Sequence, residues 1–212
     1  MRFRSRVVGT AGVTVILGLL LAASPAVAEC DPDHGIFEDE FEFLDPSWGA
    51  PADDFYVEDG ALVIKSHWGQ VNTLTQNEAA NVCVDMTIVD APAPDNSPIG
   101  LVWWWENWDN YYYLFYWPDV AYVEVRRLVK GQNQTLLSLD TLALKKGVGQ
   151  TNHVEMQLRP KDATLIINGT QVSRFKGKPP KGGGSIGVYA TSPEDQPATY
   201  KFDNLVVSAP PE

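Results

Sequence analysis

The amino-acid sequence predicts an all-β protein built as a sandwich of two antiparallel sheets. From residue 30 onward, no stretch shows the 3.6-residue apolar period of an amphipathic helix. Short runs of β-branched and aromatic residues alternate with turn signals, and Asp59-Gly60 and Asn168-Gly169 suit tight hairpins that need a positive φ. Two long connections are rich in proline or glycine, DAPAPDNSP at 90–98 and GKPPKGGG at 177–184. Many short strands without helices are typical of a two-sheet sandwich.

Each expected strand is a short run bounded by turn residues, and several alternate apolar and polar side chains. In the run at 152–158, Val154, Met156 and Leu158 share one side, which predicts one buried and one wet face. In the run at 36–43, the glutamates Glu38, Glu40 and Glu42 fall at a two-residue period and predict a solvated or charged edge. The expected strands are 36–43, 61–66, 71–75, 80–89, 99–105, 111–117, 120–128, 134–139, 152–158, 163–168, 171–175, 184–190 and 199–207.

The first 28 residues have the pattern of a secretory signal peptide. Arg2, Arg4 and Arg6 precede an apolar stretch at 7–23, and Ala-Val-Ala at 26–28 is a small-x-small cleavage site. The apolar stretch is short for a membrane span. We therefore expect a secreted or periplasmic protein that begins at Glu29, with residues 29–212 as a single β-sandwich domain and no membrane span in the mature chain.

The charge of the chain limits its partners. Loss of the three leader arginines changes the formal net charge from −11 to −14. Nucleic acids and anionic membrane surfaces both require cationic partners, so we expect neither. No motif for a cofactor or a metal ion stands out, and none is predicted.

Two cysteines, Cys30 and Cys83, remain after removal of the leader. An even count in an oxidising compartment predicts one disulfide bond, which would tether the new N-terminus to an internal strand. Two buried free thiols are the alternative.

Residues 103–117, WWWENWDNYYYLFYW, contain ten aromatic side chains and five of the seven tryptophans of the chain. A turn at Pro118-Asp119 would place Trp117 opposite Val120, and a loop at 106–110 would place Trp105 opposite Tyr111. Burying the charges of Glu124 and Arg126 in a dry core without partners would be costly, so their side of the strand is expected to face solvent. The inward side is then Val102, Trp104, Tyr112, Leu114, Val123 and Val125; the outward side is Trp103, Trp105, Tyr111, Tyr113, Phe115, Trp117, Tyr122, Glu124 and Arg126.

An outward row of aromatic rings predicts a carbohydrate-binding surface. A flat, electron-rich ring can cover the C–H face of a sugar ring while nearby polar groups bond its hydroxyls. A second core under a long loop, a homodimer interface, and a protein-binding adhesion or assembly surface are alternatives. The candidate ligand-binding residues are Trp103, Trp105, Asn107, Tyr111, Tyr113, Trp117, Glu124 and Arg126, with a glycan or polysaccharide as the expected partner.

Several short motifs, in order along the chain, resemble the concanavalin A-like lectin/glucanase family. They are Leu101-Val102, Asn110-Tyr111-Tyr112, Val123-x-Val125-x-Arg127, Gly149-Gln150-x-Asn152, Ile167-Asn168-Gly169, Gly187-Val188-Tyr189 and Phe202-Asp203-Asn204. The resemblance spans about residues 36–207 and extends to laminin-G-like domains and the 3-keto-disaccharide hydrolase family. It implies a jelly-roll fold, which hosts lectins as well as hydrolases.

The sequence favours a binding domain over an enzyme. Retaining glucanases of this fold carry Glu-x-Asp-x-(x)-Glu on one strand, and no internal strand here has that pattern. The enzymatic alternative is a glycoside hydrolase of the 3-keto-disaccharide type. Asp85 and Glu124 are its candidate acid and base, on the premise that they share one outer face.

Overall fold

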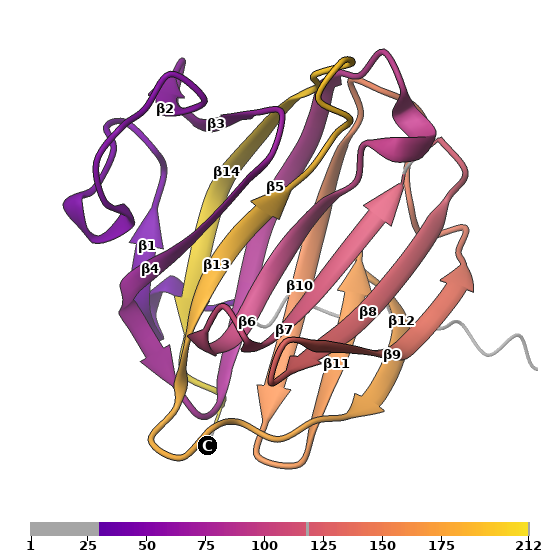
Figure 1. The fold of residues 1–212 in the computed structure, drawn as a ribbon. Helices are drawn as coiled ribbons and strands as arrows, with labels where there is room; N and C mark the ends of the chain where they lie inside the picture. Colours follow the sequence, from indigo (N-terminus) through magenta and orange to yellow (C-terminus); the bar gives the residue numbers. More distant parts are fainter. Residues whose placement is uncertain (1–29, 118, 212) are drawn as a thin grey trace, which may run out of the picture.

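The computed structural model describes residues 30–117 and 119–211 and shows two antiparallel β-sheets stacked as a sandwich. Figure 1 shows the layers, with β13, β6, β7 and β8 of one sheet crossing in front of β14, β5 and β10 of the other. Three short 3₁₀ turns lie in the connections: η1 (Pro32–His34), η2 (Pro46–Trp48) and η3 (Pro94–Asn96). The predicted all-β sandwich is confirmed; the predicted signal peptide lies outside the described residues.

The first sheet, sheet A, has eight strands in the order β12-β11-β10-β5-β14-β3-β2, with β1 also paired to β14. Its strands are β1 (Gly35–Asp39), β2 (Phe55–Glu58), β3 (Ala61–Lys65), β5 (Ala80–Asp90), β10 (Thr151–Arg159), β11 (Asp162–Ile167), β12 (Thr170–Lys176) and β14 (Thr199–Ser208).

The second sheet, sheet B, has six strands in the order β4-β13-β6-β7-β8-β9. Its strands are β4 (Trp68–Asn77), β6 (Ile99–Asn107), β7 (Asn110–Trp117), β8 (Tyr122–Val129), β9 (Gln132–Asp140) and β13 (Gly184–Ala190). Because β6, β7, β8 and β9 are consecutive in sequence and adjacent in space, the aromatic stretch lies in the middle of this sheet.

The core lies between the sheets and is formed by alternate residues of their inner faces. Val154, Met156 and Leu158 are fully buried there, as their period predicts. Large side chains such as Trp48, Tyr116 and Phe202 join them, and each contributes about 1.5–3 kcal/mol by leaving water. Among the described residues, no helix is long and apolar enough to cross a membrane.

The first strand is shorter than the sequence predicts. β1 ends at Asp39, because the Asp39 carboxylate accepts hydrogen bonds from Phe41 N and Trp48 Nε1, both at 2.8 Å. Such a local side-chain bond gives the backbone an alternative to the sheet ladder. Phe41 then takes a φ of +50° and enters the core. The predicted extent of this strand is therefore wrong, since only Glu38 of the three glutamates belongs to it, but all three glutamates are exposed as predicted.

The β6–β7 hairpin differs from the predicted register by a bulge. Trp103 pairs with Tyr112, whereas the predicted partner was Tyr113. Three residues, 104–106, then face Tyr111 alone before Asn107 pairs with Asn110. Trp104 has a φ of +48°, and this bend turns both Trp103 and Trp104 into the core. The predicted outward Trp103 and inward Val102 are thus wrong, while Trp104 is inside as predicted.

The β7–β8 hairpin also differs from the predicted register, but by two residues. Trp117 pairs with Tyr122 and Phe115 with Glu124, because the connection includes Ala121 at a φ of +55°. A shift of two residues leaves every side chain on its predicted face, since the side-chain period of a strand is two. The face assignment of β7 and β8 is therefore confirmed, although the pairing partners are not.

Gly100 permits the close approach of β6 to β7. A Cβ atom at this position would lie 1.8 Å from the carbonyl oxygen of Leu114. The glycine is paired with Phe115.

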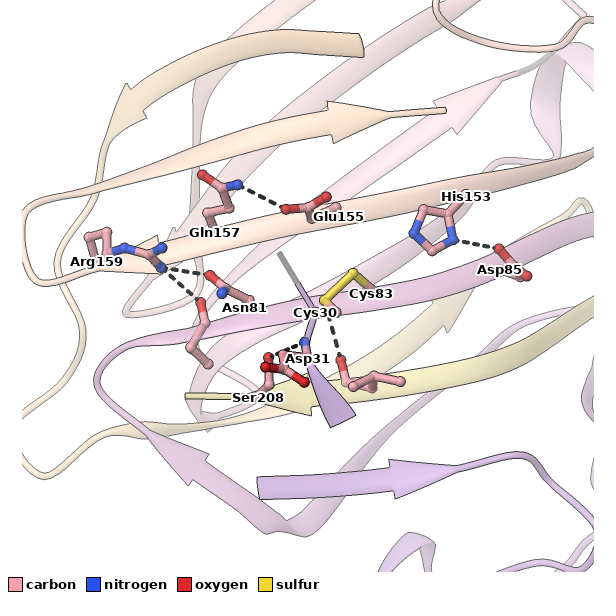
Figure 2. The surroundings of a disulfide bond; sticks show 12 residues. Cys30, Asp31, Asn81, Cys83, Asp85, His153, Glu155, Gln157, Arg159 and Ser208 are labelled. Carbon is pink, nitrogen blue, oxygen red and sulfur yellow. Dashed lines mark hydrogen bonds and ion pairs between the residues drawn. A yellow bond between two sulfur atoms is a disulfide. The ribbon is translucent and has the colours of Figure 1, made fainter. Parts of the chain in front are cut away.

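The predicted disulfide between Cys30 and Cys83 is present. Cys83 lies on β5 with its side chain on the outer face of sheet A, and Cys30 precedes η1 (Figure 2). The bond ties the start of the described chain to the centre of the sheet.

Candidate functional site

A row of aromatic rings crosses the outer face of sheet B. Alternate residues of β7 supply most of it, because side chains at a two-residue period share a face. Neighbouring rings are 5.3–6.0 Å apart between centroids and mostly edge-on or tilted, which is the arrangement that aromatic pairs prefer. We call this set the aromatic row; in order, it is Trp105, Trp108, Tyr111, Tyr113, Phe115, Trp117 and Tyr122.

The middle of the aromatic row is covered by its own neighbours. Tyr111 and Tyr113 are only 8% and 5% exposed, and they form a small second core with Val71 and Val102. Burial raises the pKa of Tyr111 to about 12. The aromatic row, which the sequence predicts to be exposed, is therefore buried at its centre, and only the rings at its two ends reach solvent.

The end at Phe115, Trp117 and Tyr122 opens into a groove of about 470 Å³, within the size range of small-ligand sites. These three half-buried rings form its apolar part. The loop that contains η3 and the loop after β13 add polar residues at the side. The lining residues are Asp95, Asn96, Pro98, Phe115, Trp117, Val120, Tyr122, Glu124, Arg126 and Thr191.

A hydrogen-bonded ion pair lies beside the rings. Arg126 Nη2 is 2.7 Å from Glu124 Oε2, and the Thr135 hydroxyl donates to Glu124 Oε1 at 3.4 Å. The hydrogen bond to Glu124 raises the pKa of Arg126. Burial raises the pKa of Tyr113, against the effect of Arg126, and its hydroxyl donates to Asn133 Oδ1 at 3.0 Å.

One buried donor at this ion pair has no acceptor among the described residues. Arg126 Nε has no hydrogen-bond partner within the part of the chain that the structure describes. Buried donors are normally paired. The groove thus places a charge-balanced ion pair next to part-exposed ring faces.

The candidate binding residues are divided by the structure. Trp117, Glu124 and Arg126 line the groove, and Trp105, Tyr111 and Tyr113 extend the aromatic row away from it. Trp103 lies between the sheets and belongs to no outer surface. Asn107 lies at the far hairpin, where its Oδ1 accepts from Asp109 N and Asn110 Nδ2, both at 3.0 Å.

Several residues of this face were not among the candidates from the sequence. Tyr189 packs against Phe115 with a centroid distance of 5.0 Å, and its alternation with Val188 was a usable signal. Trp108 was assigned to a loop. Asp95 and Asn96 lie in the Pro-rich 90–98 connection, and their place beside the groove follows only from the tertiary structure.

The nominated catalytic pair is not assembled. Asp85 lies on β5 and points to the outer face of sheet A, where it contacts His153 (Figure 2). Glu124 lies on the outer face of sheet B. The two carboxylates are on opposite sides of the sandwich, so the premise that they share one face is wrong. Glycoside hydrolysis requires two carboxyl groups within one site.

Asp85 and His153 form a charge-assisted pair of their own. His153 Nδ1 is 2.7 Å from Asp85 Oδ1, and Asn204 Nδ2 donates to Asp85 Oδ2 at 2.9 Å. The hydrogen bond from His153 lowers the pKa of Asp85 below 3.8, and the same bond raises the pKa of His153 above 6.5, against the effect of burial. Both directions favour the doubly charged pair.

Replacing His153 with glutamine should therefore destabilise the protein in a pH-dependent way. The His153 contribution is fully present below pH 6.5, its ordinary value, and is lost as the pH rises through the raised folded pKa. The Asp85 contribution is lost only as the pH falls through a pKa below 3.8. Because His153 is part-exposed and screened, we expect a loss of about 0.5–1 kcal/mol at pH 5.5 and a smaller one at pH 9, measured by urea unfolding.

His67→Gln is the matched control, because the His67 ring contacts the Thr191 hydroxyl and not a carboxylate. Its effect on stability should not share this pH dependence. An equal loss at pH 5.5 and pH 9 for His153→Gln would contradict the assignment.

The two antiparallel sheets and their strand order define the concanavalin A-like jelly-roll sandwich, as the resemblance implied. No protein-family model matches the chain, and no curated protein is similar to it. The more specific resemblance to the 3-keto-disaccharide hydrolase family is therefore not confirmed.

Solved structures with this fold include both binding modules and enzymes. The carbohydrate-binding module CBM66 from Bacillus subtilis matches with a TM-score of 0.56 and 13% identity, over 81% of this chain and 97% of that one. The catalytic domain of an endo-1,3-β-glucanase (laminarinase) from Thermotoga petrophila matches with a TM-score of 0.60 and 9% identity, over 84% and 98%. A GH43 protein from Bacillus licheniformis matches with a TM-score of 0.62 and 15% identity, over 81% of this chain and 39% of that one. At such low identity, the likeness establishes the fold alone.

Proposed function

We propose that this chain is an exported carbohydrate-binding domain, acting in a secreted or periplasmic location, that holds a neutral glycan in the groove on the outer face of sheet B. The observation that carries the proposal is the composition of the groove, in which three part-exposed rings, Phe115, Trp117 and Tyr122, adjoin the Glu124–Arg126 ion pair. The leader-like N-terminal sequence and the disulfide support the location.

The chemistry of a sugar fits this combination. Its C–H face would cover the ring of Trp117 or Tyr122 and remove apolar area from water. Its hydroxyls would accept from Arg126 and donate to Glu124 or the polar loop residues Asp95 and Asn96. Because Glu124 compensates the charge of Arg126 and Asp95 adds a second carboxylate, the groove lining has no excess of cations, and a neutral glycan fits it better than an anionic one.

The structural neighbours support a carbohydrate ligand, since a carbohydrate-binding module and glycoside hydrolases share the fold. A hydrolase is not favoured by the geometry, because the one nominated carboxylate pair is split between two faces. A search for hydrolysis belongs in the same experiment.

Replacing Trp117 with alanine should weaken glycan binding at least about tenfold, because 1.4 kcal/mol of lost ring contact corresponds to that factor. The measurement is calorimetric titration of the protein with a panel of neutral soluble polysaccharides, with product analysis for cleavage. Any glycan that binds the unaltered protein is then titrated into the variant.

The matched control is Trp108→Ala. Trp108 is a tryptophan on the same face, 45% exposed, but at the other end of the aromatic row and outside the groove. Its loss should change Kd less than twofold. Equal weakening by both variants, or no heat with any glycan, would count against the groove, whereas hydrolysis abolished by Glu124→Gln would establish an enzyme instead.

A further inference from the structure

A second cavity, of about 640 Å³, opens at the end of the sandwich where the 177–184 connection passes below sheet B. It is lined by residues of β6, β7 and β8 from both faces of sheet B together with that connection, and it shares no lining residue with the groove. Its lining residues are Glu78, Trp104, Glu106, Asn110, Tyr111, Tyr112, Arg127, Leu128, Pro160, Lys178, Pro179, Pro180 and Lys181.

Two aromatic side chains give this cavity a fixed wall. Trp104 and Tyr112 pack edge to face with centroids 5.1 Å apart. Trp104 Nε1 donates to the Glu78 carbonyl at 3.1 Å, and the Tyr112 hydroxyl accepts from Lys178 N at 3.2 Å. A Cβ atom at Gly177 would lie 2.7 Å from the Trp104 ring, so the connection packs directly against this wall.

The connection itself is held in place by further hydrogen bonds. Gly182 N donates to Glu78 Oε1 at 3.1 Å, and Gln76 Nε2 donates to the Gly182 carbonyl at 3.2 Å. Two consecutive prolines, Pro179 and Pro180, restrict the backbone between these anchors. The cavity is thus preformed, which reduces the entropy lost on binding.

The cations of this cavity form no ion pair with any carboxylate that the structure describes. Arg127, Lys178 and Lys181 make no ion pair within residues 30–117 and 119–211. The Arg127 guanidinium lies over the Tyr112 ring, 5.1 Å from its centroid, which orients its planar fork. The lining also holds two carboxylates, Glu106 and Glu78, and Glu78 accepts from Gly182 N, so the formal charge of the lining is +3 − 2 = +1. A lining with a net positive charge contrasts with the formal net charge of −11 of the whole chain.

We propose that this cavity binds an acidic sugar unit, whose carboxylate or sulfate group pairs with Arg127 and the two lysines. The guanidinium fork matches both anions in a bidentate geometry. The volume lies in the range of small-ligand sites and exceeds what one inorganic anion fills, so a ring-bearing anion fits better than a bare ion. This assignment depends on the cavity alone and not on the neutral-glycan groove.

The test is a calorimetric titration of the protein at low ionic strength with four probes. They are an oligogalacturonate, a sulfated galactan oligomer, a neutral galactan oligomer and inorganic sulfate. We expect at least one acidic oligomer to bind at least about tenfold more tightly than either the neutral oligomer or inorganic sulfate. The acidic oligomer that binds more tightly shows whether the preferred anion is a carboxylate or a sulfate. Binding of inorganic sulfate as tight as that of the oligomers, or no preference over the neutral oligomer, would overturn the proposal.

Variants then locate the bound anion. Arg127→Gln should weaken acidic-oligomer binding at least about tenfold, and Arg127→Lys should restore part of it by keeping the charge without the fork. Arg174→Gln is the charge-matched control, because Arg174 is an exposed arginine on β12 paired with Asp162, outside the cavity. Equal effects of Arg127→Gln and Arg174→Gln would refute the assignment.

Two further variants separate a failure of this proposal from a folding defect and from a failure of the groove. Lys181→Gln removes an exposed loop cation and should weaken acidic-oligomer binding even if Arg127→Gln fails to fold; an unchanged Kd would contradict the proposal. Trp117→Ala should leave acidic-oligomer binding unchanged, so a failure of this cavity and a failure of the groove give different results.

Discussion

Replacing Trp103 with alanine is expected to lower the free energy of unfolding by about 3–5 kcal/mol, the usual cost of a large-to-small change at a fully buried aromatic residue. Trp103 is 0% exposed and packs between the sheets against Tyr112 and Phe175, at centroid distances of 6.1 and 6.2 Å. Its removal would leave a cavity in the centre of the core. Urea unfolding followed by circular dichroism measures the change.

The matched variant is Trp105→Ala, the same substitution two residues further along the strand. Trp105 is half-buried on the outer face, so its loss should cost only about 1–2 kcal/mol. This pair of variants tests the bulge at Trp104 directly. Without the bulge both tryptophans would share one outer face, and the two substitutions would then have similar effects.

Removing the disulfide is expected to have the second large effect. Cys30 and Cys83 are 53 residues apart in sequence, and a cross-link that closes a loop of this length contributes about 4 kcal/mol in the chain-entropy description. The double variant Cys30→Ser, Cys83→Ser should lose stability of that order, measured by urea unfolding. The loss arises because the unfolded chain gains freedom.

A reductant supplies the control for this effect. Dithiothreitol should lower the unfolding midpoint of the unaltered protein to about that of the double serine variant, and it should leave the variant unchanged. An unaltered midpoint in the double variant would mean that the bond does not constrain the unfolded state.

Much of the face assignment in the aromatic stretch could be predicted from the sequence. Glu124 and Arg126 alternate with Val123 and Val125, and charged side chains avoid an unpartnered interior, so the wet side of β8 was determined. The assumed turn was two residues too short, but an even shift does not exchange faces. Trp117 therefore lies on the face that the sequence predicts.

In the neighbouring strand β6, the sequence does not predict which side chains face the core. Nothing in Trp103-Trp104-Trp105 distinguishes a regular strand from a bulged one, because all three residues are apolar aromatics and suit either face. The φ of +48° at Trp104 is stabilised by contacts distant in sequence, including its hydrogen bond to Glu78 and its packing on Gly177. Trp103 was misassigned for this reason.

Which part of the aromatic row is exposed to solvent also depends on the tertiary structure. The row of rings at Tyr111 and Tyr113 is on the predicted face, yet Val71 of β4 and Val102 of β6 pack beside it and close its centre. The groove at Trp117 remains open and gains Asp95 and Asn96 from a loop that precedes β6. Its binding role stays a proposal that Trp117→Ala tests.

The sequence by itself determined the all-β class, the two-sheet sandwich and the outer face of β7 and β8, and it favoured the disulfide over two free thiols, because each depends on local alternation, turn chemistry or a count of cysteines. Only the tertiary structure decided the bulge at Trp104, the separation of Asp85 from Glu124 and the two cavities at opposite ends of the sandwich. Those features depend on which strands become neighbours and how their side chains pack, and neither is encoded within a short stretch of chain.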